Sequence, residues 1–600
     1  MRTAAIFGLL ALLPGSVLAV ACSAANDPPA DPSGSGAGSG IGGGGTGGEG
    51  AGIGFGGFGG GDPSGAGCSS DLQKVVDEDG GIIQICPPDQ GCSQGQCIPA
   101  CQAAANSKGS IGCAYYAPAT PFYWNEQASS SYDGACHAVF VANTWGRPAK
   151  LSVQRDGQAL DATAFGYIPS GIGPSTTYTP LPPDGVPPGE VAVLFLSHRP
   201  GVMTVFNTTL ECPRPPALLL DTAVQSSGRG SAVEVLSDTP ITAYDILPYG
   251  GASSYLPSAA HLFPSSTWGD NYYVVGPHPT QSGQLWMTLV GSANGTTVDL
   301  VPASSLPGGP DVPAATAGSP VQLTINAGEM VQWLGGDPSG TVIQASQPIG
   351  VWTGNNYLQV STQTSPGGGG QDSAHQQIAP ISALGSEYVG AGVVTRISGG
   401  QPESVPYRLL GVVDGTTLTW DPAPPPGAPA SLGAGQVVEF ETTGLFSVRA
   451  QDENHPFALT HYLGGAIGSL GDEEWVIQLP PRQFLQRYVF FTDPTYGTTT
   501  LVVTRVRGAN GFSDVTLSCL GLVQGWQPIG SGGQFEVAHV TLTQSFIGAV
   551  PACETSRHEA TSDGAFGITV WGTDYYASYG YPAGGNVGVI NTVVVPPVPE

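Results

Sequence analysis

The chain has 600 residues, including 90 glycines and 54 prolines, a composition that excludes a predominantly helical protein. Its net charge of −28 and its three lysines exclude a nucleic-acid-binding protein, which needs a basic surface, and disfavour docking to anionic lipid. Only 10% of the residues are charged, so the thinly spread acidity favours solubility outside the cell over the attraction of cations such as calcium.

Residues 1–22 have the pattern of a secretory signal peptide. Arg2 precedes a short apolar run that cannot form a stable transmembrane span. The run ends in Leu18–Cys22, which is similar to a bacterial lipobox, where the cysteine becomes the lipidated first residue after cleavage. We therefore predict lipidation at Cys22 and a lipoprotein of the outer membrane or cell surface. Ordinary cleavage beside the neighbouring alanines, which would give a secreted protein, is the alternative.

Residues 23–67 are rich in Gly, Ser, Ala and Pro, and they have little apolar bulk. Such a segment cannot form a core, so we predict a disordered linker. Its glycine strings are superficially similar to phosphate-binding loops, but no strand precedes them and no helix follows. Behind a lipidated cysteine, this linker would hold a folded ectodomain away from the membrane.

Residues 68–113 form a small cysteine-rich module that needs cross-links, because it is too short for a sufficient hydrophobic core. We expect a β-hairpin over residues 71–86 and a short helix near residues 100–106. Without Cys22 the chain has ten cysteines, an even number that suits five disulfides in an oxidising compartment. Zinc binding within the cluster is a weaker alternative, because no CxxC pair is present. The disulfide candidates are Cys68, Cys86, Cys92, Cys97, Cys101 and Cys113 in the module, Cys136 and Cys212 in the first repeat described next, and Cys519 and Cys553 in the last. We expect pairing within each of these two repeats, while the six cysteines of the module allow fifteen connectivities.

A fourfold internal repeat fills residues 114–600. Four closing segments have similar sequences, and their anchor positions lie 108, 108 and 109 residues apart. A period this regular indicates one structural unit copied in tandem. The proline before three of these segments suggests the start of a strand or an edge position. The anchors are Pro240, Pro348, Pro456 and Ala565.

Other elements keep their place within the period. Asn294-Gly295 and Asp414-Gly415 lie between apolar runs, as in tight hairpins. A Pro-Gly-Tyr landmark precedes each hairpin. We therefore predict an all-β protein built from tandem β-sandwich-like repeats of about 110 residues, with a propeller-like closed array as the alternative. A final strand is expected over residues 587–595. The landmark positions are Pro264, Gly269, Tyr272, then Pro380, Gly385, Tyr388, then Pro480, Leu485, Tyr488.

No catalytic motif in the sequence lies in the secondary-structure setting that its chemistry needs. The Gly-x-Ser-x-Gly pattern at residues 91–95 lies in the cysteine-rich module without the strand and helix that a nucleophile elbow needs. His261 and His375 precede similar landmark segments, and a shared histidine could bind a metal or act as a base, but a structural hydrogen bond is the simpler role. We predict no enzyme and no cofactor, with calcium as a weak alternative. The carboxylates considered for calcium are Asp270, Asp299, Asp372, Asp452 and Glu453.

Aromatic residues recur near strand ends and mostly suit β-sheet cores. Their density is highest in residues 575–581, beside glycine and proline. An exposed aromatic loop there could stack on sugar rings or anchor a protein partner. The weak binding-site candidates are Tyr575, Tyr576, Tyr579 and Tyr581.

The repeat region resembles the N-terminal domain of IgGFc-binding proteins over roughly residues 114–590. The likeness lies in Cys136–Asn143, Ser237–Tyr244, Leu262–Gly269 with Tyr272, and Ser578–Asn586. The lipobox-like signal, the linker and the cysteine-rich segment look like versions found in myxobacteria and related delta-proteobacteria. In vertebrates this domain is linked to mucus and antibody Fc binding and is fused to von Willebrand D modules, which this sequence does not contain.

The resemblance implies surface-exposed binding or adhesion. We therefore expect a cell-surface-anchored extracellular protein that recognises a protein or polysaccharide and meets the membrane only through its lipid. A structural surface or matrix component without a discrete ligand is the first alternative. An extracellular hydrolase is the second.

Overall fold

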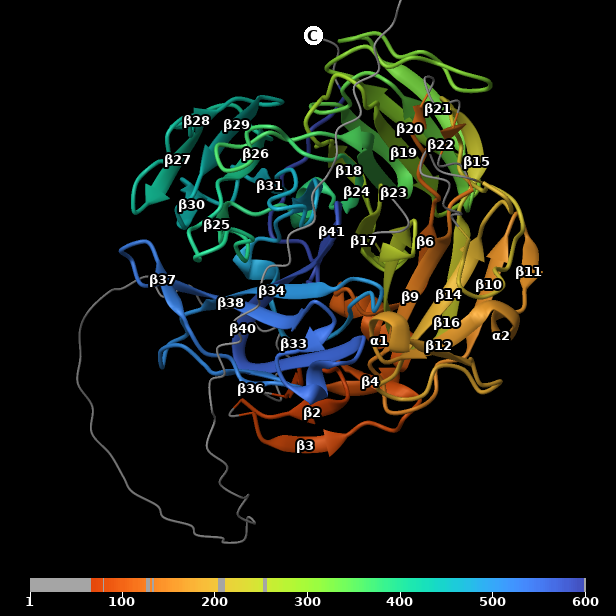
Figure 1. Ribbon diagram of the computed structural model, residues 1–600, viewed down its shortest axis with the longest axis vertical. Helices are drawn as coiled ribbons and strands as arrows, with labels where there is room; N and C mark the ends of the chain where they lie inside the picture. The colour runs from red at the N-terminus through yellow and green to blue at the C-terminus, as the bar shows by residue number, and fades with distance from the viewer. Residues whose placement is uncertain are drawn as a thin grey trace, which may run out of the picture. The chain divides into compact units, whose positions relative to one another are not determined.

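The computed structural model describes residues 66–597, except for 79, 126–129, 132–133, 203–210 and 252–255. Strands dominate this part of the chain, and its α-helices are Ala100–Ser107 (α1) and Ala162–Phe165 (α2) (Figure 1). The predicted all-β class is confirmed. The predicted signal peptide, Cys22 and nearly all of the predicted linker lie outside the described residues. No helix of the described residues is long and apolar enough to cross a membrane.

The cysteine-rich module contains one three-stranded sheet, one hairpin and helix α1. Antiparallel β2 and β3 form the predicted hairpin, and α1 lies where a helix was expected. Three disulfides cross-link the module: Cys68–Cys92, Cys86–Cys97 and Cys101–Cys113. Its strands are β1 (Gly67–Cys68), β2 (Lys74–Val76), β3 (Ile82–Ile85), β4 (Gln90–Ser93) and β5 (Gln96–Pro99).

The second of the four repeated units shows the plan clearly. The long strand β23 (Val342–Leu358) belongs to two sheets: its first half pairs with β18 and β20, and its second half pairs with β19 and β24. Met287 and Trp333 of one sheet share a buried core with Leu300 and Ile325 of the other, which makes a β-sandwich-like unit. The other strands are β18 (Gly269–Tyr273), β19 (Leu285–Gly291), β20 (Thr296–Val301), β21 (Val321–Ile325), β22 (Glu329–Leu334) and β24 (Asp372–Ile378).

The same plan recurs in the other three units. The first unit has β6 (Gly112–Ala117), β9 (His137–Asn143), β10 (Leu151–Arg155), β11 (Gln158–Leu160), β12 (Gly166–Ser170), β13 (Thr177–Pro180), β14 (Val191–Ser197), β16 (Val233–Leu247) and β17 (Ser258–Leu262). The third has β25 (Glu387–Gly390), β26 (Val405–Gly411), β27 (Thr416–Asp421), β28 (Ser431–Leu432), β29 (Val437–Thr442), β30 (Phe446–Ala450), β31 (Phe457–Leu463) and β32 (Glu474–Ile477). The fourth has β33 (Leu485–Phe491), β34 (Thr498–Val506), β35 (Val515–Leu517), β36 (Gly521–Leu522), β37 (Gln527–Ile529), β38 (Phe535–Gln544), β39 (Ile547–Gly548), β40 (Arg557–Asp574) and β41 (Ala577–Pro582).

A few elements fall outside this plan. Strand β15 (Gly228–Ser231) precedes β16 in the chain but pairs with β22 of the second unit, and β7 (Trp124–Asn125) pairs only with β8 (Ser130–Ser131). Disulfides join Cys136 to Cys212 in the first unit and Cys519 to Cys553 in the last, as predicted. The 3-10 turns are η1 (Gly173–Ser175), η3 (Ser265–Thr267), η4 (Ile381–Ala383), η5 (Pro481–Gln483) and η6 (Pro551–Cys553).

The anchor residues mark the kink where each long strand passes from one sheet to the other. Pro240 lies inside β16 and Pro348 inside β23, so the expectation of a strand start or edge position is wrong for these two. Pro456 does directly precede a strand, β31. The register of β16 shifts between Leu236 and Ile241, around the first of these prolines. Proline has no backbone N–H to donate to a neighbouring strand. It is tolerated at this place because the regular hydrogen bonding between the strands is already interrupted by the register shift.

The four units close into a ring. The innermost strands contact one another in the order β17, β24, β32, β41 and back to β17. In Figure 1 the units follow one another around the view, from orange and yellow through green and teal to blue. Residues of the first and fourth units share one hydrophobic core, in which the rings of Phe140 and Phe491 stack 3.8 Å apart. The sandwich-like repeats are thus arranged as the propeller-like array that the sequence left as an alternative.

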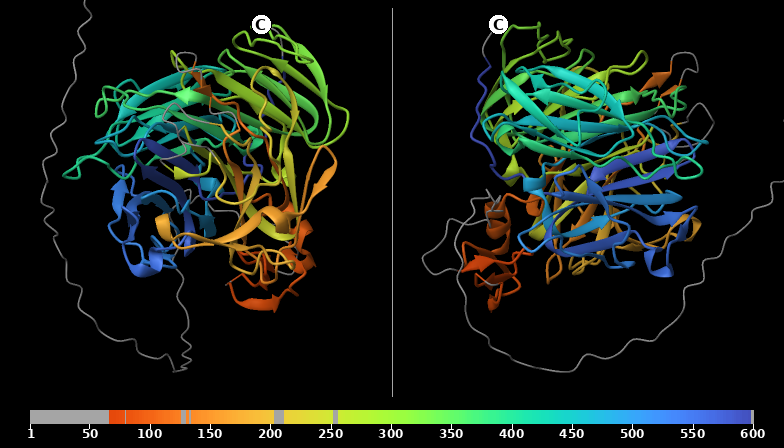
Figure 2. Two further views of the ribbon diagram at one scale, coloured as in Figure 1. Left: turned by 45° about the vertical axis from the view of Figure 1, so that its right-hand side comes forward. Right: turned by 90° about the vertical axis from the view of Figure 1, so that its left-hand side faces the viewer.

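The two ends of the repeat region meet at this junction. The backbone N–H of Ser110 donates to the carbonyl of Gly585 at 2.8 Å, and Val587 donates to Lys108 at 2.7 Å. Residues 587–595 are not a strand, contrary to expectation, because they pair with no sheet. They run past the turn η4, where Asn591 Nδ2 donates to the carbonyl of Ile381 at 2.7 Å. In Figure 2 the blue C-terminal segment runs alongside the green strands of the second unit. The C-terminal segment therefore ties several units together.

Candidate functional site

A groove of about 640 Å³ opens between the first and fourth units. The first unit contributes residues of β12, β13 and β14, including Ile168, Ser170 and Glu190. The fourth contributes Cys519 and Arg557, next to the disulfide-linked turn η6. Binding sites for small ligands range from about 300 to 1,000 Å³, so the groove has the capacity of a binding site.

Charged groups give one wall of the groove a defined electrostatic character. Arg557 Nη2 lies 3.1 Å from Glu559 Oε2, and Arg487 Nε donates to the other oxygen of the same carboxylate at 2.8 Å. The Nε atom of Arg557 is buried without a partner among the described residues. Glu190 of the opposite wall is exposed. Apolar Ile168 belongs to the same lining, so the groove combines apolar contact with polar recognition.

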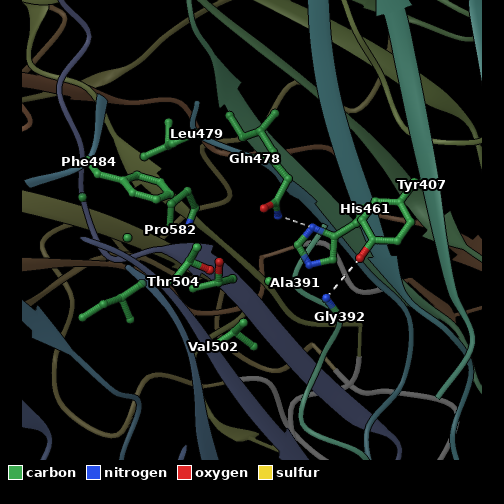
Figure 3. A pocket seen from close by; sticks show the side chains of 15 residues that line it. Ala391, Gly392, Tyr407, His461, Gln478, Leu479, Phe484, Val502, Thr504 and Pro582 are labelled. Atoms are coloured by element: carbon green, nitrogen blue, oxygen red, sulfur yellow. Dashed lines mark hydrogen bonds between the residues drawn. The ribbon is translucent and has the colours of Figure 1, made fainter. Parts of the chain in front are cut away.

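A second cavity, between the third and fourth units, is small (Figure 3). It holds about 30 Å³, which is enough for a water molecule and too little for an organic ligand. Gln478 is hydrogen-bonded to His461 Nδ1, and the N–H of Gly392 donates to the Tyr407 hydroxyl at 3.1 Å. Burial lowers the pKa of His461 to about 3, so this imidazole stays neutral. The cavity belongs to the packing between units.

Buried carboxyl groups join the innermost strands across the ring. Ser258 of β17 donates to Glu474 of β32 at 3.3 Å, and the N–H of Ser578 of β41 donates to Asp372 of β24 at 2.8 Å. Burial raises the pKa of Glu474 and of Asp372 well above the ordinary values, and Asp472 raises that of Asp372 further. The raised pKa values favour the protonated forms of both groups, and protonation removes the cost of burying their charge.

The histidines considered as metal ligands or bases are buried and not equivalent. His261 pairs with Tyr244 across β16 and β17, whereas His375 pairs with Gly354, two places further along the corresponding strand pair. His375 Nε2 lies 3.2 Å from Asp245 Oδ1 at the boundary between the first two units. Both rings are at most 2% exposed, so neither is accessible to a substrate.

The carboxylates considered for calcium are not brought together. Asp299 accepts from Gln322, Asp452 pairs with His455, and Glu453 pairs with Arg482, while Asp372 lies in the ring centre and Asp270 on β18. Among the described residues, no group of three or more His, Cys, Asp or Glu side chains could hold a metal ion.

The four candidate tyrosines separate into two pairs. Tyr579 and Tyr581 are each 1% exposed within the core, so the structure contradicts a direct ligand contact for them. Tyr575 is 63% exposed, and its ring lies edge-on to that of Tyr576. A binding role for this second pair stays a prediction.

Sequence reasoning missed the groove because its walls are far apart in the chain. Ser170 and Arg557 meet only because the ring closes between the first and last units. Neither residue lies in a motif. The repeat period is the one sequence signal that concerns these two residues. It indicates that neighbouring units pack against each other, but it does not show which side chains lie at the junction.

A sequence profile described as "IgGFc binding protein" matches residues 258–572, just over half of the chain. The match begins at the first residue of β17 and ends within β40, so it spans the second and third units and most of the fourth. No curated protein matches the chain. Members of this family are extracellular binding proteins, and the match places the chain in this class.

Proposed function

Since the chain belongs to the IgGFc binding protein family, we propose that it is a cell-surface adhesion protein that recognises a protein or glycan ligand in the groove between its first and fourth units. Lipidation at Cys22 would anchor it in the outer membrane, with residues 23–67 as the spacer. The anchor and the bacterial, myxobacterial type of the family are parts of this proposal that rest on the sequence pattern.

The observation that carries the proposal is the 640 Å³ groove with its paired charges. Arg557 and Glu190 line it from two different units, and Ile168 adds apolar surface to the lining. Groups that converge from separate elements on an open hollow are typical of a recognition site. The catalytic patterns considered in the sequence do not converge there.

Binding of the full-length chain to four ligands tests the proposal: cells of the source organism, their exopolysaccharide, a glycan set and immunoglobulin Fc. Ser170→Trp should block the groove without disturbing a core, because Ser170 is exposed. Thr324→Trp, at an exposed position on β21 of the second unit, is the matched control.

Loss of saturable binding in the Ser170 variant alone would support the groove. Equal binding by both variants would place the ligand elsewhere and overturn that assignment. A wild-type chain that binds none of the four would favour the alternative of a structural surface component.

A further inference from the structure

A pocket of about 240 Å³ lies between the third and fourth units, apart from the groove. One wall is the loop of residues 393–398 of the third unit, and the other is the sheet face formed by β34, β38 and β40. The volume is slightly below the usual range for drug-sized ligands, so the pocket suits one compact group.

The sheet face presents hydroxyl groups from neighbouring strands. Thr500 pairs with Thr541 on one side and with Trp571 on the other, and Thr498 pairs with Thr573. Residues opposite one another or two apart in a strand share a face, and all five line the pocket. No side-chain hydrogen bond joins the four threonine hydroxyls to another described residue.

A tryptophan forms part of the same pocket wall. Trp571 is 2% exposed, and its Nε1 atom has no hydrogen-bond partner among the described residues. Trp352 and Trp475 have the same unpartnered indole N–H, so this feature recurs between units, and Trp571 contributes side-chain surface to the pocket wall. Gln544 contributes an amide to the same lining.

The pocket carries no free charge on its lining residues. Arg396 is its one charged lining residue, and its Nη2 lies 2.8 Å from Glu403 Oε2, with both side chains at most 4% exposed. The guanidinium also donates to the carbonyls of Gly464 and Leu470, so it holds the loop in place and is not available to an anion. The remaining polar groups are uncharged.

An exposed aromatic residue is bridged through its backbone to this lining. Tyr575 follows Thr573 by two residues and forms a β-bridge with Leu470, which lines the pocket. Tyr575 is 63% exposed. A sugar has hydroxyl groups that form hydrogen bonds and C–H faces that pack on aromatic rings. A site with neutral hydroxyl and amide groups next to aromatic rings is therefore complementary to a sugar.

We propose that this pocket binds a single neutral sugar unit, held by the threonine hydroxyls and the Gln544 amide against the Trp571 side chain, with Tyr575 nearby in the chain. The assignment does not depend on the groove, because no residue lines both. It gives the chain a second recognition site, specific for an uncharged glycan terminus.

The test titrates the full-length chain with neutral hexoses, N-acetylhexosamines, glucuronate and sialic acid, followed by saturation-transfer NMR and tryptophan fluorescence. Thr500→Val removes one hydroxyl at nearly constant shape and should weaken binding of the preferred neutral sugar about three- to tenfold. Thr500→Ser keeps the hydroxyl and should therefore retain most of the wild-type affinity for that sugar. Thr516→Val, on β35 of the same unit and outside the pocket lining, is the matched control and should leave binding unchanged.

Three outcomes would overturn the proposal: no saturable binding of any neutral sugar, equal loss in the Thr500→Val and Thr516→Val variants, or tighter binding of a charged sugar. The groove-blocking Ser170→Trp variant should retain sugar binding. A failure of the groove assignment and a failure of the sugar pocket can therefore be told apart.

Discussion

The hydroxyl oxygen of Tyr272 lies 2.6 Å from the carbonyl oxygen of Ile349, the residue that follows the kink proline of the second unit. The same hydroxyl accepts from the N–H of Gly269 at 3.1 Å. The relationship recurs elsewhere in the ring, since Tyr115 donates to Ile241 at 2.5 Å and Tyr488 to Phe566 at 2.5 Å. The landmark tyrosine thus fixes the point where each long strand changes sheet.

Tyr272→Phe should lower the free energy of unfolding by about 1–3 kcal/mol, because it leaves a buried N–H and a buried carbonyl without a partner. Chemical denaturation followed by tryptophan fluorescence measures the change. Tyr575→Phe removes an exposed hydroxyl and should have almost no effect. Equal stability of the two variants would contradict the role assigned to Tyr272.

Gly269→Ala should also destabilise the ring, by about 1–3 kcal/mol, because overpacking forces neighbouring groups apart. A methyl group on Gly269 would lie 2.5 Å from the Cβ of Pro380, the landmark proline of the next unit. Gly367→Ala is the control, because no atom lies within 4 Å of that added methyl group. The midpoint of thermal unfolding compares the two. A tolerated Gly269→Ala would show that the units can separate locally at little cost.

Stability should fall as the pH rises above 6.5. Burial raises the pKa of Asp493 to about 7 and that of Glu474 well above its ordinary value, so the folded state keeps protons that the unfolded state loses above about pH 4. Each such group contributes a decrease of at most about 1.4 kcal/mol per pH unit until its folded pKa is passed. The buried histidines have lowered pKa values, for example about 3 for His261, and they oppose this trend only below about pH 6.5.

Denaturant titrations at pH 6.5, 7.5 and 8.5 check the direction. Glu474→Gln should flatten the dependence, since the amide keeps the shape without a titrating proton. The control variant Glu453→Gln, at an exposed position, should leave the pH dependence of stability unchanged. A stability that rises between pH 6.5 and 8.5 would show that the ring carboxyls are ionised in the folded protein.

Reducing agent should destabilise residues 68–113 more than residues 260–460. The first segment contains three disulfides, whereas the second contains no cysteine. Loss of cross-links raises the entropy of the unfolded module. Hydrogen exchange with and without reductant resolves the two segments. Equal sensitivity would mean that the module has a sufficient core of its own.

Cys22→Ala should abolish labelling by a radioactive or clickable fatty acid and release the protein from membranes. The variant removes the atom that would carry the lipid and leaves the rest of the signal region unchanged. Cell fractionation measures release, and Cys519→Ala controls for the loss of a cysteine elsewhere. Retention of the Cys22→Ala protein in the membrane would contradict the lipoprotein prediction.

The repeat period was the strongest information in the sequence, and it predicted the units, the hairpins and the all-β class. The period did not show whether a proline at the anchor position starts a strand or lies at a kink within one. Pro240 is compatible with both positions, and only the pairing of its strand with neighbouring strands decides between them. The closed ring was one of two alternatives, since contacts such as Phe140 with Phe491 depend on packing between distant units.

The cysteines were more informative than the aromatic residues. An even number placed in three groups led to the observed pairing within the first and last units. Tyr579 is buried because it lies on β41 within the core, whereas Tyr575 is exposed in the turn between β40 and β41, a difference that sequence density does not reveal. The landmark glycines Gly269 and Gly385 are explained by the proline of the next unit, which leaves no room for a Cβ, whereas the fourth unit has Leu485 at this position.

The bond between Ser110 and Gly585 spans 475 residues of sequence. A chain that leaves the cell N-terminus first therefore presents one half of this contact long before the other half has emerged. Phe140 and the rest of the shared core stay uncovered during that interval. Export and folding are thus separated in time, and the emerging chain needs protection from aggregation until its last residues have crossed the membrane.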